Sequence, residues 1–139
     1  MKDVMVKIVG TQYNEGQEES VEFVTEGRLY KKNDAFYLIY KEGEMTGLGE
    51  CITTLKARDE NVKIIRRGEI LPADTHIEFE EGRPYEGYYA TPYGTVEMKV
   101  VTNKVTNALT EEGGHLSIDY HMCLTGLSEG RSVLDINIL

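Results

Sequence analysis

The chain has 139 residues, and 15 Lys and Arg against 24 Asp and Glu give it a formal net charge of −9 at pH 7. Its length is typical of one domain, expected over residues 1–139, and its 40% hydrophobic content excludes wholesale disorder. The acidic balance argues against nucleic acid and an anionic membrane as partners, because phosphate groups attract basic proteins.

Apolar and polar residues alternate through most of the chain, which is the period of a half-buried β-strand. In chain order this pattern predicts strands at residues 4–8, 36–40, 62–66, 95–100, 116–124 and 134–138, among others. Turn signals containing Gly, Asn or Asp separate the runs at the spacing of β-hairpins. The stretch 70–75 contains Pro72 and is expected to be a connecting loop.

About ten short strands and almost no helical periodicity leave a β-sandwich or a β-barrel. Consecutive hairpins without long crossovers favour the barrel. We therefore predict an all-β, antiparallel up-and-down β-barrel of about 8–10 strands, similar to the lipocalins and calycins. The interior of such a barrel is either filled by side chains or holds one small ligand.

Five segments of the chain carry a resemblance to a known family, and they occur in the expected order. They are residues 44–48 (EMTGL), 66–69 (RRGE), 77–82 (IEFEEG), 89–95 (YATPYGT) and 112–120 (EGGHLSIDY). Together they resemble the YwiB-like family, small uncharacterised bacterial proteins with a calycin (lipocalin-like) β-barrel. The resemblance implies this fold but no activity, and ligand binding follows only by analogy with other calycins.

Arg66 is the first candidate site residue, because it alternates with Val62 and Ile64 on the apolar face of its predicted strand. An arginine inside a barrel needs an anion, since an unpaired buried charge is costly. It could clamp a ligand carboxylate or phosphate. Alternatively it pairs with an internal carboxylate such as Glu44, or a register slip places it outside. Its neighbour Arg67 is expected on the opposite, solvated face.

Other candidate ligand contacts are polar or aromatic. Glu44 and Thr46 lie in a polar segment bounded by glycines, which predicts either polar contacts at the barrel rim or a turn or β-bulge. Tyr89, Tyr93 and Tyr120 are candidates for an aromatic wall of the site, with cross-strand packing as the alternative.

One predicted strand face carries residue types found in enzymes: His115, Ser117, Asp119, His121 and Cys123. Such a face could be drawn as a hydrolase triad or as half of a zinc site. The opposite face is strongly apolar and is expected to point inward, which leaves the polar face in solvent; it consists of Leu116, Ile118, Tyr120, Met122 and Leu124. We therefore assign no catalytic residue, no metal site and no cofactor.

The sequence is compatible with two functions. The first is a non-enzymatic barrel that binds a small, partly apolar molecule, with an anionic group as one option. The alternative is an interaction or structural module with a filled core, which could form a homodimer. Cys51 and Cys123 show no zinc or disulfide spacing, and no signal or membrane-spanning segment is evident, so we expect a cytoplasmic protein.

Overall fold

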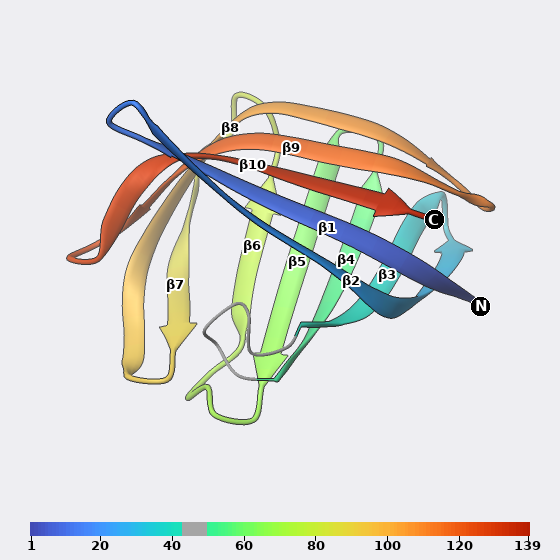
Figure 1. Cartoon of the computed structure of the whole chain (residues 1–139), viewed down its shortest axis with the longest axis horizontal. Helices are drawn as coiled ribbons and strands as arrows, with labels where there is room; N and C mark the ends of the chain where they lie inside the picture. Colours follow the sequence, from blue (N-terminus) through green and yellow to red (C-terminus); the bar gives the residue numbers. More distant parts are fainter. Residues whose placement is uncertain (43–49) are drawn as a thin grey trace.

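The computed structural model describes residues 1–42 and 50–139. This part of the chain contains ten strands and no helix that is long and apolar enough to cross a membrane (Figure 1). The strands are β1 (Lys2–Asn14), β2 (Gln17–Lys32), β3 (Ala35–Glu42), β4 (Cys51–Arg58), β5 (Asn61–Gly68), β6 (Thr75–Phe79), β7 (Tyr85–Thr91), β8 (Gly94–Thr110), β9 (Gly113–Leu124) and β10 (Ser128–Ile138).

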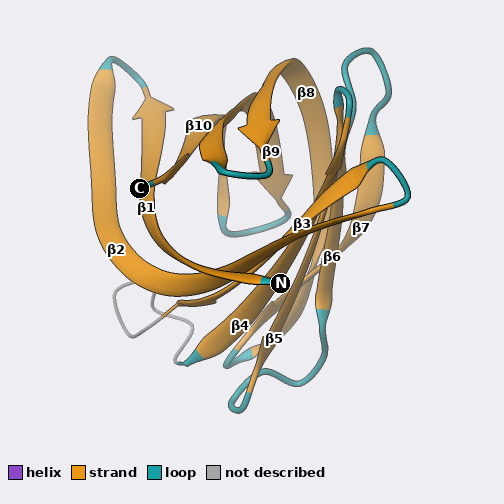
Figure 2. Ribbon diagram, turned by 90° about the vertical axis from the view of Figure 1, so that its right-hand side faces the viewer, coloured by secondary structure: helices purple, strands orange, loops and turns teal. Residues whose placement is uncertain are grey.

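All ten strands belong to one antiparallel sheet with the order β6-β5-β4-β3-β2-β1-β10-β9-β8-β7. Strands that follow one another in the sequence pair with each other, except β6 and β7, and the pairing of β1 with β10 joins the two halves of the meander. The sheet curls around a common interior, as Figure 2 shows. The prediction of an all-β up-and-down barrel is confirmed, and the expected loop at 70–75 ends where β6 begins.

The barrel is nearly closed, because β6 and β7 meet without forming a ladder. The backbone N–H of Ala90 donates to the Thr75 hydroxyl at 2.9 Å. The backbone N–H of Val105 donates to the Glu81 carboxylate at 3.0 Å. The first bond joins β6 to β7, and the second joins the segment after β6 to β8, so isolated hydrogen bonds take the place of a ladder at this seam.

The interior follows from the alternation, because every second side chain of each strand faces the core. Fully buried residues from opposite walls include Val6, Leu38, Leu55 and Ile118. The core cluster they belong to draws on both halves of the meander. Inward and outward positions therefore agree with those expected from the sequence.

Strand register brings one group of polar residues together inside the barrel. Tyr40 of β3 lies opposite Thr53 of β4, and Thr53 lies opposite Arg66 of β5. Glu42 follows Tyr40 by two residues and shares its inward face. The adjacent wall is incomplete, because β2 pairs with β3 only from Gly27 onward, and the earlier part of β2 curves away (Figure 2).

Candidate functional site

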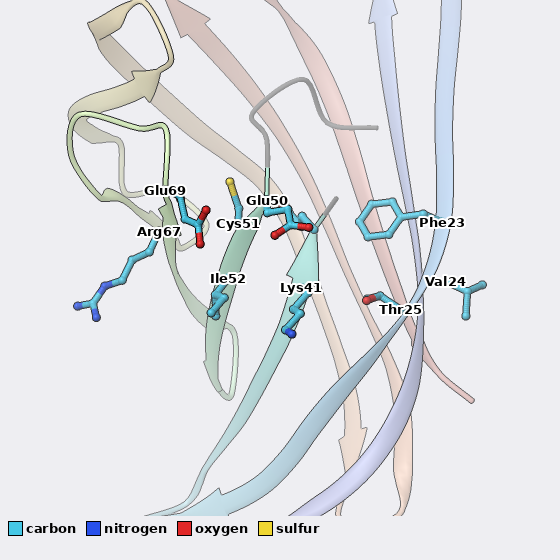
Figure 3. A pocket seen from close by; sticks show the side chains of 11 residues that line it. Phe23, Val24, Thr25, Lys41, Glu50, Cys51, Ile52, Arg67 and Glu69 are labelled. Carbon is cyan, nitrogen blue, oxygen red and sulfur yellow. The ribbon is translucent and has the colours of Figure 1, made fainter. Parts of the chain in front are cut away.

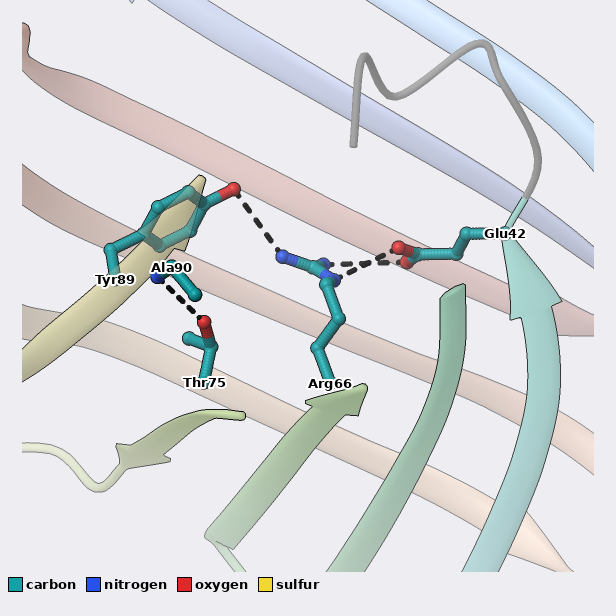
Figure 4. A network of polar contacts seen from close by, with 5 residues as sticks. All are labelled: Glu42, Arg66, Thr75, Tyr89 and Ala90. Atoms are coloured by element: carbon teal, nitrogen blue, oxygen red, sulfur yellow. Dashed lines mark hydrogen bonds and ion pairs between the residues drawn. The ribbon is translucent and has the colours of Figure 1, made fainter. Parts of the chain in front are cut away.

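A buried ion pair between Arg66 and Glu42 lies at the centre of the candidate site (Figure 4). The Arg66 Nε lies 2.9 Å from Glu42 Oε2, and the side chains are only 18% and 5% exposed. Arg66 Nη2 donates to Glu42 Oε1 at 3.3 Å, and Nη1 donates to the Tyr89 hydroxyl at 3.4 Å. Three strands, β3, β5 and β7, therefore contribute to one polar cluster.

The hydrogen bonding of this cluster is incomplete. The Nε–Oε2 contact is a contact between charges without the alignment of a hydrogen bond. Among the described residues, Arg66 Nε, Glu42 Oε2 and the neighbouring Thr53 Oγ1 lack a hydrogen-bond partner although they are buried. Unsatisfied buried polar atoms cost stability, so the cluster is poorly explained as a purely structural device.

Burial and nearby charges shift the pKa values of Arg66 and of its neighbours. Burial alone would lower the pKa of the Arg66 guanidinium, but Glu42, Tyr89 and Tyr40 together outweigh burial and hold that pKa above its usual value. Burial raises the pKa of the Tyr40 hydroxyl, and the Glu42 charge raises it further. Burial likewise raises the pKa of the Cys51 thiol and of the Tyr120 hydroxyl. These three groups are therefore uncharged at neutral pH.

Arg66 and Tyr89 line a cavity of about 190 Å³. Its apolar wall comes from β5, β6, β9 and β10: Ile64, Ile77, Phe79, Met122, Leu124 and Leu134. Tyr120 completes this wall by packing against Phe79, with the ring centroids 4.9 Å apart and the planes tilted by 57°. The cavity thus combines an apolar body with a few polar groups, which is typical of small-molecule sites.

Polar residues of two hairpin tips line the outer part of the cavity, among them Gln12, Asn14, Ser128 and Arg131. These four residues are exposed, so this part is the mouth of the cavity. Arg131 is already paired: its Nε and Nη2 donate to the two Asp119 carboxylate oxygens at 3.0 and 2.7 Å.

The structure brings together three of the predicted site residues: Arg66, Tyr89 and Tyr120 all line the cavity. Tyr93 does not line it, because it lies in the turn between β7 and β8 and is 100% exposed. Glu44 and Thr46 lie outside the described residues. Arg66 does pair with an internal carboxylate, and that carboxylate is Glu42.

Sequence reasoning missed Glu42, Tyr40 and Thr53 as members of the cluster. A signal for Glu42 exists, because the apolar face of residues 36, 38 and 40 continues at residue 42. A carboxylate at the next inward position of a strand is a candidate partner for an inward arginine. Thr53 and Tyr40 carry no comparable signal, since their proximity to Arg66 depends on strand register.

The face His115 to Cys123 of β9 points outward, as its apolar opposite face predicts. His115 lies 3.4 Å from Asp135 and His121 lies 3.5 Å from Glu129, both on β10. With the Asp119–Arg131 pair between them, these contacts form a row of polar pairs across the two strands. In the described part of the chain, no group of three or more metal-ligating side chains comes together.

A second hollow of about 690 Å³ lies beyond Glu42, between the curved part of β2 and the ends of β3, β4 and β5 (Figure 3). Phe23, Glu50, Cys51 and Glu69 are among its lining residues. Glu42 borders this hollow and Arg66 borders the cavity, so the ion pair separates the two spaces. The candidate site is the smaller cavity, on the Arg66 side of the ion pair.

Comparisons with known proteins place this barrel among similar chains. The sequence is 31% identical over 109 residues to the uncharacterized beta-barrel protein YwiB of Bacillus subtilis (strain 168), covering 78% of this chain and 73% of that protein. The crystal structure of the ywiB protein from Bacillus subtilis has a TM-score of 0.80 at 24% identity, covering 99% and 92% of the two chains. This second likeness concerns the fold alone.

The sequence also matches the family described as a domain of unknown function, DUF1934, over residues 6–136. This match covers β2 to β9 in full and most of β1 and β10, and it includes Glu42, Arg66, Tyr89 and Tyr120. With the fold, the relative and the family match in agreement, the chain belongs to the DUF1934, or YwiB-like, family of β-barrel proteins of unknown function.

Proposed function

We propose that this protein is a non-enzymatic barrel that binds a small, partly apolar molecule in the cavity beside Arg66. The observation that carries the proposal is the position of a buried, incompletely hydrogen-bonded guanidinium beside the apolar wall of a cavity that has a polar mouth. The hydrocarbon part of a ligand would contact the apolar wall. Its polar group would then meet the Arg66 and Tyr89 donors.

The size of the cavity limits the ligand. At about 190 Å³ it is smaller than the roughly 300–1,000 Å³ of pockets that hold drug-sized molecules. A ligand of the size of a single substituted ring or a short acyl chain suits this space. Long lipids and nucleotides are too large for the cavity as it stands.

The energetics of the ion pair also favour a binding role. A buried ion pair can often be replaced by packed apolar residues with no loss of stability, and sometimes with a gain of about 1–4 kcal/mol. Its presence is therefore weak evidence for a stabilising role. The desolvation of the two charges is unfavourable. A charged group at a cavity wall is therefore better explained by contact with a ligand that enters the cavity.

Native mass spectrometry of protein purified gently from its own cells, without chelators, tests the proposal. We expect a small-molecule adduct on wild type that is lost in Arg66→Met and retained in Arg67→Met. Arg67 is the matched control, because it is adjacent in sequence, faces outward and pairs with Asp74 at 2.9 Å on the surface. An adduct that persists in Arg66→Met would show that Arg66 is not part of the binding site. A wild-type protein without any adduct would count against ligand binding as its function.

A second candidate function is self-association through the outer face. Met5, Val24 and Ile52 are 43%, 53% and 49% exposed, and they line an outer groove of about 1,110 Å³. The adjoining stretch of β2 before Gly27 pairs with no described strand on that side, which leaves a sheet edge that a second copy could extend.

The negative charge of β2 makes self-association a weaker candidate than ligand binding. Glu18, Glu19, Glu22 and Glu26 lie along the same stretch of β2, and in a pair of identical edges they would repel one another. Analytical ultracentrifugation of wild type and Val24→Lys decides the question. A dimer that Val24→Lys dissociates would favour self-association, and a monomer at high concentration would exclude it.

A further inference from the structure

We infer that the cavity selects an uncharged ligand that presents a hydrogen-bond acceptor, such as an amide or ketone carbonyl, and that Glu42 is the residue that excludes anions. The inference rests on the proposed function and specifies the chemistry of the same site. It replaces the anionic ligand that the sequence left as an option.

The first step is the charge balance around Arg66. Its charge is already matched by Glu42, with the closest atoms 2.9 Å apart. Tyr40, Cys51 and Tyr120 are neutral neighbours, because burial raises the pKa of each. An anionic ligand would therefore add an uncompensated negative charge to a buried neutral pair, which is unfavourable.

The second step concerns the mouth of the cavity. Arg131 is the other cationic side chain that lines it, and both of its bonded nitrogens donate to Asp119. Glu129 also lies at the mouth. Arg66 and Arg131 are thus both engaged by carboxylates, so the described lining of the cavity offers an anion no free positive charge.

The third step identifies the ligand group that the inner wall can hold. A guanidinium has five N–H donors, and Arg66 directs Nη1 toward Tyr89. The Tyr89 hydroxyl accepts that bond and keeps its own proton available for donation. Two neighbouring donors suit a carbonyl oxygen, which has two lone pairs.

A cationic ligand is disfavoured by the orientation of the pair. Arg66 lines the cavity, whereas Glu42 lines the hollow on the other side. A molecule in the cavity therefore meets the donors of the guanidinium and not the acceptors of the carboxylate. The geometry points to an acceptor group without charge.

Benzamide and benzoate are suitable probes, because they have nearly the same shape and differ in charge. Each is titrated at pH 7 into isotope-labelled wild type and Glu42→Gln, and binding is followed by the backbone amide shifts of cavity residues such as Phe79 and Met122. We expect wild type to prefer benzamide by about tenfold or more. In Glu42→Gln, the ratio should shift toward benzoate by about tenfold or more, because Arg66 is then unpaired.

The outcomes separate this inference from the proposed function. If both probes bind wild type equally, if benzoate binds better, or if Glu42→Gln leaves the ratio unchanged, the exclusion role of Glu42 is wrong while ligand binding stands. If neither probe shifts a cavity residue in either protein, both the inference and the proposed function fail. Should Glu42→Gln not fold, the wild-type ratio decides alone, and a preference for benzamide below about tenfold overturns the inference.

Discussion

The ion pair between Arg66 and Glu42 permits a quantitative prediction about stability. In Glu42→Gln the carboxylate charge disappears while the shape of the side chain is nearly kept. The Arg66 charge, in a side chain that is only 18% exposed, then has no ionic partner among the described residues. Removing one partner of a buried pair typically costs about 3–5 kcal/mol, because the other charge remains desolvated.

The expected loss of unfolding free energy is near the lower end of that range. Arg66 reaches the cavity, so water can solvate part of its guanidinium once Glu42 is neutral. We therefore expect Glu42→Gln to lower the unfolding free energy by about 3 kcal/mol. For a chain of this length, about 4 °C of melting temperature per kcal/mol makes this a shift of roughly 12 °C.

Urea unfolding at pH 7, followed by far-ultraviolet circular dichroism and tyrosine fluorescence, measures this loss. Asp74→Asn is the matched control: it removes a carboxylate from the exposed Arg67–Asp74 pair, and we expect a change within about 0.5 kcal/mol. The double variant Glu42→Leu/Arg66→Met should return to within about 1 kcal/mol of wild type, because neither charge is then buried alone. A Glu42→Gln loss no larger than that of Asp74→Asn, or a double variant less stable than Glu42→Gln, would refute the reasoning.

Three further predictions concern other parts of the barrel. Phe79 is 1% exposed, so Phe79→Ala should lower the unfolding free energy by about 3–5 kcal/mol in the same urea assay; a loss below about 1 kcal/mol would mean that the wall collapses around the gap. Gly114 has a φ of +113° and its backbone approaches that of Ala108, so Gly114→Ala should destabilise by at least about 1 kcal/mol, and an unchanged midpoint would contradict this backbone geometry. Hydrogen bonding from Arg131 lowers the pKa of Asp119 below its usual 3.8. The stabilisation by this carboxylate is therefore fully present above pH 3.8 and is lost as the pH falls through the lowered pKa. Carboxyl-carbon NMR titration should show this low pKa in wild type and a higher one in Arg131→Met, and equal values in the two proteins would exclude Arg131 as its cause.

Much of the fold could be predicted from the sequence, because strand alternation is a local property. The inward face of residues 62, 64 and 66 and the outward face from His115 to Cys123 both follow from the period of a strand. Most turns between the runs are short, so strands that follow one another in the sequence pair, with β6 and β7 as the exception. The number of strands and the up-and-down arrangement then follow.

The candidate site was less predictable, because its members come from strands far apart in the sequence. Arg66 was identified since a charge on an apolar strand face is visible locally. Its partner Glu42 lies 24 residues away, at the end of β3. Tyr93 stands next to the cavity-lining part of β7, yet the turn that follows β7 carries its side chain into solvent.

By itself, the sequence determined which side chains face the interior, because a β-strand alternates its side chains whatever it packs against. Only the tertiary structure decided which inward residues meet. The cavity forms where β5 and β6 face β9 and β10 across the barrel, and no described ladder joins those two pairs of strands. Their separation depends on how the sheet coils and on where its last seam between β6 and β7 closes, and both depend on the register of all ten strands together.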